Sequence, residues 1–366
     1  MGRLRVLLAL SVVFWHTGGL RGYAMIGGPL AVQCFFIVSG FYMGLVLNER
    51  YDRPALNRAF YANRAIRIYG TYFLFLALTL AVFAAVQLRD GYSPLWPYLT
   101  ETVSLPEKAL LALLNLTVVG QDLPYWLGIA DGHLYWSAEA MRHSEPDVYH
   151  FMAIPVAWSL SLELCFYALA PYIARRPVWQ IVALCGASLL ARIVAAWIGY
   201  DADPWSYRFF PFELALFLAG VLAYRAFAAW RGSWTGIPAR VLALAVPAAI
   251  LAYPFVAGDV PDDQFFAPAR LALLALLAFA LPAIHTWSQH SRTDRAIGEL
   301  SYPLYLGHLL VLGLIGGISP LAGNSIVRTI GVSAVSLALA WLMVRFLDVR
   351  IEAYRRGIAA KAGAST

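Results

Sequence analysis

The sequence alternates long apolar runs with short polar segments over nearly its whole length. A run of about 20 apolar residues is what an α-helix needs to cross the hydrocarbon core of a bilayer. The pattern therefore predicts an all-α fold, a polytopic membrane bundle of about ten transmembrane helices. The predicted spans are residues 3–20, 29–47, 66–87, 152–173, 178–199, 208–229, 239–257, 266–287, 301–318 and 326–347.

The composition supports an integral membrane protein. Apolar residues make up 61% of the chain and charged residues 13%, whereas soluble domains carry about 25% charged residues. The long runs leave no room for a sizeable soluble domain, and we expect a multi-pass membrane protein. Cys34, Cys165 and Cys185 all fall inside predicted spans, and we interpret them as small apolar fillers rather than metal ligands or a disulfide framework.

The distribution of charge predicts the orientation. If the N-terminus lies in the cytoplasm, most arginines fall in inside segments, whereas the short outside segments carry aspartates or no charge. This asymmetry favours both termini on the cytoplasmic side. The net charge of +6 then reflects membrane topology and indicates no nucleic-acid partner.

One outside segment, residues 88–151, is much longer than the others. It carries three basic and eight acidic residues and is rich in tryptophan, tyrosine and proline. Aromatic rings beside carboxylates suit a sugar-binding surface, although an interfacial aromatic belt with a solvated acidic loop has the same composition. Its apolar stretch, residues 108–119, is too short to span the bilayer and is expected to lie on the membrane or pack on the bundle.

The first predicted span carries two ionisable residues, Arg5 and His16. They are eleven positions apart, which places both on one face of an α-helix with a rise of about 16 Å between them. Such a pair is costly in lipid and indicates a functional site. The pairing suggests a charged group held by the arginine and a proton moved by the histidine. Alternatively, Arg5 snorkels to the headgroups and His16 hydrogen-bonds locally.

A pair of arginines, Arg64 and Arg67, stands at the expected cytoplasmic entrance of the third span. At positions i and i+3 the two guanidinium groups share a helix face. Paired guanidinium groups match the geometry of phosphate. The positive-inside rule alone would also explain the two arginines, as an anchor at the cytoplasmic face. The expected nearness of this pair to Arg5 favours the interpretation that it binds phosphate.

The fourth span contains Trp158, Ser159 and Glu163, with the serine and the glutamate on one face. A glutamate inside an apolar run is expensive and should face the bundle interior, against His16, Arg192, Arg270 or an acceptor hydroxyl. A buried ion pair that only fixes helix packing is the alternative. The partner of Arg192, deep in the fifth span, is left open by the sequence.

The ninth span begins with three polar residues on one face, Ser301, Tyr305 and His308. Tyr305 and His308 are candidate substrate-binding residues, together with Trp158 and Ser159. A lone histidine in a helix is more often structural than catalytic, and we therefore rank His308 well below His16.

Together these segments resemble the acyltransferase-3 family of membrane acyltransferases. The resemblance is carried, in order, by Arg5 and His16, FFIVSGFYMG at 35–44, NRAIRIYGTYF at 63–73, WSLSLELCFYALAP at 158–171 and ELSYPLYLGHLLV at 299–311. It implies a ten-helix core, residues 1–350 including the 88–151 segment, followed by a short cytoplasmic tail at 351–366. It also implies transfer of an acyl group, most commonly acetyl, from cytoplasmic acyl-coenzyme A to a hydroxyl of a glycan or small molecule on the outer side.

The resemblance assigns roles to five residues. His16 matches the essential histidine and Arg5 its paired arginine, Arg64 and Arg67 match the cytoplasmic arginine pair that would hold the donor, and Glu163 matches the acid of the fourth-span motif. The histidine would act as a general base or carry the acyl group covalently. No resident cofactor and no metal are expected, and the oligomeric state cannot be deduced.

Two other functions fit the same pattern of buried charge. A transporter of an acylated or anionic solute would have the same architecture, although the internal pseudo-symmetry typical of transporters is not visible. A non-catalytic component of a polysaccharide assembly complex would use these residues for packing alone.

Overall fold

The computed structural model describes residues 1–100, 102–139, 144–258, 261, 264–315 and 323–348 of the chain. The expected tail at 351–366 lies outside the described residues. The helices are α1 (Gly2–Thr17), α2 (Gly27–Glu49), α3 (Asn57–Asp90), α4 (Trp96–Leu99), α5 (Leu105–Thr117), α7 (Trp158–Ile173), α8 (Val178–Trp197), α9 (Phe210–Ala229), α10 (Gly236–Ala257), α11 (Pro268–Ser288), α12 (Arg292–Glu299), α13 (Ser301–Ile315) and α15 (Ser325–Met343). Two short strands, β1 (Leu127–Ala130) and β2 (His133–Trp136), form an antiparallel hairpin.

The structure confirms a predominantly helical membrane protein. Within the described residues, nine helical segments are long and apolar enough to cross a membrane. They correspond to the second through tenth predicted spans. The first predicted span forms α1, whose 16 residues end at Thr17, about 24 Å of helix. This length is shorter than the hydrocarbon core of an average bilayer, about 30 Å.

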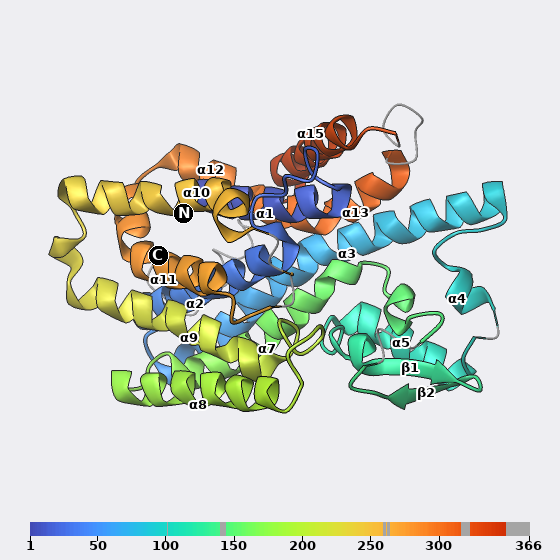
Figure 1. Ribbon diagram of the computed structural model, residues 1–366, viewed down its shortest axis with the longest axis horizontal. Helices are drawn as coiled ribbons and strands as arrows, with labels where there is room; N and C mark the ends of the chain where they lie inside the picture. Colours follow the sequence, from blue (N-terminus) through green and yellow to red (C-terminus); the bar gives the residue numbers. More distant parts are fainter. Residues whose placement is uncertain (101, 140–143, 259–260, 262–263, 316–322, 349–366) are drawn as a thin grey trace.

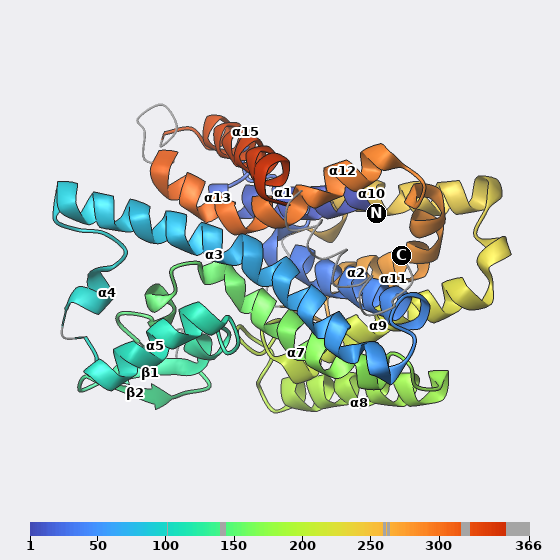
Figure 2. The same cartoon turned by 180° about the vertical axis from the view of Figure 1, so that it is seen from behind.

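Most of the long helices run along the long axis of the molecule (Figure 1). α8 and α15 lie at opposite edges of the bundle in both views (Figures 1 and 2). The 88–151 segment gathers α4, α5 and the hairpin at one end, beside the part of α3 that extends beyond the bundle (Figure 1).

α2 lies at the centre of the main core and approaches α9 closely. A Cβ atom on Gly40 would lie 1.9 Å from the carbonyl oxygen of Phe217, and one on Gly220 would lie 2.0 Å from that of Ile37. Small residues at a helix crossing let two backbones approach to a distance that side chains would prevent. The two glycines therefore set the spacing between α2 and α9.

α3 supports the 88–151 segment. Its 34 residues extend about 51 Å, so the predicted span 66–87 is only part of the helix. The Tyr72 hydroxyl donates to the carbonyl oxygen of Asn115 over 2.7 Å, and the Tyr69 hydroxyl donates to that of Thr117. The apolar stretch at 108–119 thus forms most of α5 and packs on α3.

Candidate active site

α1 is held at its N-terminal end by a carboxylate of α12. The Asp294 side chain accepts hydrogen bonds from the backbone N–H groups of Gly2, at 2.6 Å, and Arg3, at 3.0 Å. It also pairs with the amino group of Met1 at 2.8 Å. The first N–H groups of a helix have no intrahelical partner and carry partial positive charge, so an anion here stabilises the helix start. This contact fixes the end of α1 from which Arg5 projects.

The other end of α1 is held by α15. The chain leaves α1 at Gly18, which has a φ of 81°, a left-handed conformation that glycine adopts without steric cost. The Arg328 side chain donates from Nε to the carbonyl oxygen of Thr17 over 2.8 Å. The Thr17 hydroxyl lies 2.8 Å from that of Thr329. His16 is therefore positioned by a helix that is fixed at both ends.

His16 of α1 meets His308 of α13. The Nε2 atom of His308 lies 3.1 Å from the Nδ1 atom of His16, and the ring centroids are 4.9 Å apart. His308 is fully buried and its Nδ1 atom lies 2.7 Å from the carbonyl oxygen of Tyr305. The sequence analysis ranked His308 below His16, but the structure places the two in direct contact.

The contacts determine which nitrogens carry protons when both rings are neutral. A carbonyl oxygen only accepts, so Nδ1 of His308 must carry its proton and Nε2 of His308 must accept. Nδ1 of His16 faces that acceptor and also the carbonyl oxygen of Val12 at 3.0 Å. It must therefore carry the proton of His16, which leaves Nε2 of His16 unprotonated. Nε2 makes no hydrogen bond within the described residues, so a basic nitrogen is available there.

The other predicted substrate-binding residues lie next to this pair. The hydroxyls of Ser159 in α7 and Tyr305 in α13 are 2.9 Å apart. Each also donates to the carbonyl oxygen of Val156, over 3.1 Å and 3.0 Å. Trp158 packs edge-on against Tyr207 with ring centroids 5.6 Å apart. These contacts join α7 to α13 one helical turn from His308.

Glu163 lies with the arginines. Its carboxylate accepts a hydrogen bond from the Tyr167 hydroxyl at 3.0 Å, and the charges of Arg5 and Arg67 both act on it. Arg67 pairs with Glu299 at 3.9 Å, and the charges of Arg64 and Arg67 act on Tyr167.

We call Arg5, Arg64 and Arg67 the arginine cluster, because the charge of each acts on Glu163 or on Tyr167, which bonds to it. The sequence analysis named His16, Arg192 and Arg270 as partners for this carboxylate and overlooked Arg5 and Arg67, whose charges act on it. No ion pair joins Glu163 to His16 in the described part of the chain. The cluster lies toward the start of α1, and the two histidines lie toward its end.

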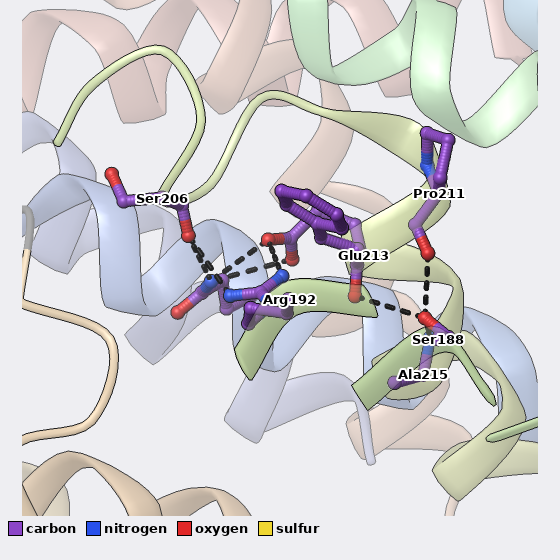
Figure 3. A network of polar contacts seen from close by, with 8 residues as sticks. Ser188, Arg192, Ser206, Pro211, Glu213 and Ala215 are labelled. Carbon is purple, nitrogen blue, oxygen red and sulfur yellow. Dashed lines mark hydrogen bonds and ion pairs between the residues drawn. The ribbon is translucent and has the colours of Figure 1, made fainter. Parts of the chain in front are cut away.

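Arg192 pairs with Glu213, not with Glu163. The ion pair joins α8 to α9, and a second nitrogen of Arg192 donates to the carbonyl oxygen of Ser206 at 2.9 Å (Figure 3). Gln33 of α2 donates to Glu213 at 3.0 Å, and the Arg192 guanidinium lies 3.6 Å from the ring centroid of Phe265. The sequence analysis overlooked Glu213, although an acid inside the predicted span 208–229 carries the same signal as Glu163.

The 88–151 segment brings aromatic rings to the histidine end of the bundle. Tyr125 stacks on Tyr149 with centroids 5.6 Å apart and planes at 5°. Trp126 stacks on Trp136 at 6.1 Å and 3°. A cavity of about 330 Å³ is lined by Tyr92, Pro94, Trp96, Pro146 and His150. Tyr92, Trp96 and His150 bring aromatic rings to this cavity, and the sugar-binding surface stays a prediction.

Comparison with known proteins identifies the family of the chain. The model of the acyltransferase-3 family, described as an acyltransferase domain, matches residues 3–345. No curated protein and no solved structure gives a significant match.

Proposed function

Because the chain belongs to the acyltransferase-3 family of membrane proteins, we propose that it transfers an acyl group, acetyl in the first instance, from acyl-coenzyme A to a glycan hydroxyl across the bilayer. The donor would bind from the cytoplasm and the acceptor from the outer side, in a bacterial inner membrane. The modification would be O-acetylation of a surface or secreted polysaccharide. The observation that carries this proposal is the basic Nε2 of His16 at the opposite end of α1 from the arginine cluster.

The arginine cluster suits the phosphates of coenzyme A. Guanidinium groups hold their charge at all relevant pH values and bind phosphate through two parallel hydrogen bonds. Arg5, Arg64 and Arg67 come from two helices, and their charges act on Glu163 or on Tyr167, which bonds to it. Glu163 would keep them oriented while it offsets part of their mutual repulsion. The helical rise from Arg5 to His16 is about 16 Å, a distance that the pantetheine arm of coenzyme A can span.

The histidine pair suits base catalysis at the thioester. Nε2 of His16 would take the proton of the acceptor hydroxyl as its oxygen attacks the thioester carbonyl carbon. His308 would hold His16 in the tautomer with the proton on Nδ1 and share the charge of the imidazolium that forms. When the C–S bond breaks, the coenzyme A thiolate would take the proton back from Nε2. His16 would then be neutral again for the next cycle.

The outer face of the site suits a glycan. Sugars bind to aromatic rings through their C–H faces, and the 88–151 segment supplies Tyr92 and Trp96 to an exposed cavity. We propose that this segment selects the acceptor. Ser159 and Tyr305 would supply hydroxyls at the point where the acceptor enters.

The test is transfer of radiolabelled acetyl from acetyl-coenzyme A to the glycan fraction of membrane vesicles. Label should appear with the wild type, disappear with His16→Ala, and persist with His290→Ala, a matched control because His290 is exposed. Equal label with His16→Ala and the wild type, at equal amounts of membrane-inserted protein, would reject His16 as the base. No consumption of acetyl-coenzyme A by the wild type would reject the transferase and favour transport. Label trapped on the protein without acceptor would replace base catalysis by an acyl-histidine intermediate.

A further inference from the structure

Arg208 is an arginine whose position the proposed reaction does not yet explain. It lies just before α9 and is 8% exposed. Its Nε atom donates to Oδ1 of Asp203 over 2.7 Å and its Nη2 atom donates to Oδ2 over 3.2 Å. Nη2 also lies 2.9 Å from the Tyr207 hydroxyl, which itself donates to Asp203 at 2.6 Å. One edge of the guanidinium is therefore fully bonded and fixed.

The faces of the same guanidinium are covered by aromatic rings. Its central carbon lies 3.8 Å from the ring centroid of Tyr125, 4.4 Å from that of Trp158 and 4.6 Å from that of Tyr207. Rings at these distances stabilise a buried cation and restrict its rotation. Nη1 points away from Asp203 and has no hydrogen-bond partner among the described residues. A buried donor left unsatisfied costs about 1–3 kcal/mol, so a hydrogen bond from Nη1 to a ligand would recover that cost.

A chain of contacts connects this cage to the histidine pair. Trp158, which covers one face of the guanidinium, precedes Ser159 in the chain, and the Ser159 hydroxyl lies 2.9 Å from that of Tyr305. The carbonyl of Tyr305 holds His308, which contacts His16.

The charge of Arg208 acts on both His16 and Tyr305. No hydrogen bond or ion pair joins Arg208 to His16 within the described residues. The two groups are therefore related by charge and by the chain of contacts through Trp158, Ser159, Tyr305 and His308, without direct contact.

We propose that Nη1 of Arg208 is the donor that stabilises the oxyanion of the acyl transfer. This inference rests on the proposed function. When the acceptor oxygen bonds to the thioester carbon, the π electrons of the carbonyl move to its oxygen, and Nη1 donates a hydrogen bond to that oxyanion. When the intermediate collapses, the carbonyl reforms, the C–S bond breaks, and the thiolate takes its proton from His16.

Arg208 suits this role because it is organised before the substrate arrives. A donor that is already fixed where negative charge develops needs no reorganisation in the transition state, and removing one such donor lowers kcat by about 10²–10³-fold. Asp203 is then a positioning residue, since it directs Nη1 without touching the acyl group. The rings of Tyr125, Trp158 and Tyr207 exclude water from the cation.

The test compares the kinetics of Arg208→Ala with those of the wild type and of Arg89→Ala. Arg89 is a matched control because it forms an arginine–aspartate pair with Asp90 but is 75% exposed. We expect Arg208→Ala to lower kcat by about 10²-fold or more with the KM for acceptor nearly unchanged, and Arg89→Ala to behave as the wild type. Added guanidinium ion should restore part of the kcat of Arg208→Ala only, which a purely structural role would not predict.

The other outcomes are distinguishable. If Arg208→Ala does not insert stably, Asp203→Asn replaces it and should lower kcat by a smaller factor without affecting insertion. A folded Arg208→Ala with normal kcat, or with only a raised acceptor KM, would overturn the oxyanion role. If the wild type consumes no acyl-coenzyme A, the proposed function itself is wrong. If the wild type is active and Arg208→Ala is equally active, only the oxyanion role of Arg208 is wrong.

Discussion

The Nε2 atom of His308 lies 3.1 Å from the Nδ1 atom of His16, although 292 positions separate the two histidines. The contact fixes the proton of His16 on Nδ1, because the carbonyl oxygen of Tyr305 fixes the proton of His308 on the nitrogen that faces away from His16. A neutral imidazole can act as a base only at the nitrogen without a proton. The orientation of one histidine thus determines the chemistry available at the other.

Replacing His308 should lower kcat, and the loss should be smaller when the new side chain can accept a hydrogen bond from Nδ1 of His16. We expect His308→Ala to lower kcat by about 10²-fold, because Nδ1 of His16 keeps the carbonyl oxygen of Val12 but loses the ring that shares the charge of the imidazolium. His308→Gln should retain more activity, because its amide oxygen can accept from Nδ1 of His16. The measurement is kcat for acyl transfer at equal amounts of folded protein. Equal kcat for the alanine and glutamine variants would show that His308 only fills space.

The arginine cluster should control the affinity for the donor. Each charge-assisted hydrogen bond to phosphate contributes about 1.5–3 kcal/mol, so Arg64→Ala or Arg67→Ala should raise the KM for acyl-coenzyme A by about tenfold or more, with a smaller change in kcat. Arg53→Ala is the control, because its side chain is 67% exposed. A KM that is unaffected by either change would place the donor elsewhere.

The spans could be predicted because their cause is local. An apolar run long enough to cross a bilayer must satisfy its own backbone hydrogen bonds, and the helix does so. The second through tenth spans therefore correspond to helices, with boundaries displaced where polar residues extend a helix beyond the apolar run, as in α3. The hairpin of β1 and β2 was not predicted, because it lies in the polar 88–151 segment, where no span signal operates.

The site could be predicted only in part, because its contacts join distant segments. Arg5 and His16 share one helix, so periodicity relates them directly. The contact of His308 with His16 could not be predicted, because nothing in the helix of His308 indicates a partner in α1. Arg208 was overlooked because it stands at the edge of a predicted span, where an arginine is ordinary. Only the fold shows that aromatic rings cover it and that Asp203 fixes it.

Enlarging either glycine at the α2–α9 crossing should destabilise the protein. Gly220→Ala would place a methyl group 2.0 Å from a carbonyl oxygen, and the helices must separate to admit it. Overpacking of this kind costs about 1–3 kcal/mol, which should lower the Tm in detergent. Gly186→Ala in α8 is the control, because a Cβ there meets nothing within 4 Å. A Tm for Gly220→Ala equal to that of the control would contradict the close approach.

The ion pair of Arg192 and Glu213 should stabilise the fold in a way that depends on both partners. The two side chains are 3% and 0% exposed, so removing one leaves the other charged, buried and only partly bonded. Breaking a buried pair costs about 3–5 kcal/mol, whereas replacing both partners by apolar residues of similar size is often nearly neutral. We therefore expect Arg192→Leu to lower the Tm in detergent strongly. The double variant Arg192→Leu, Glu213→Leu should recover much of that loss, and the part not recovered reflects Gln33, which loses its acceptor.

The matched control is Arg231→Leu, which breaks the exposed pair with Glu49. Those side chains are 56% and 36% exposed, and pairs of this kind contribute about 0–1 kcal/mol. Its Tm should lie close to that of the wild type. Among the described residues, no hydrogen bond or ion pair joins Arg192 or Glu213 to His16 or His308. The folded fraction of each variant should therefore transfer acyl groups at the wild-type kcat when assayed well below its Tm. A double variant less stable than Arg192→Leu would show that Glu213 stabilises the bundle through Gln33 rather than through Arg192.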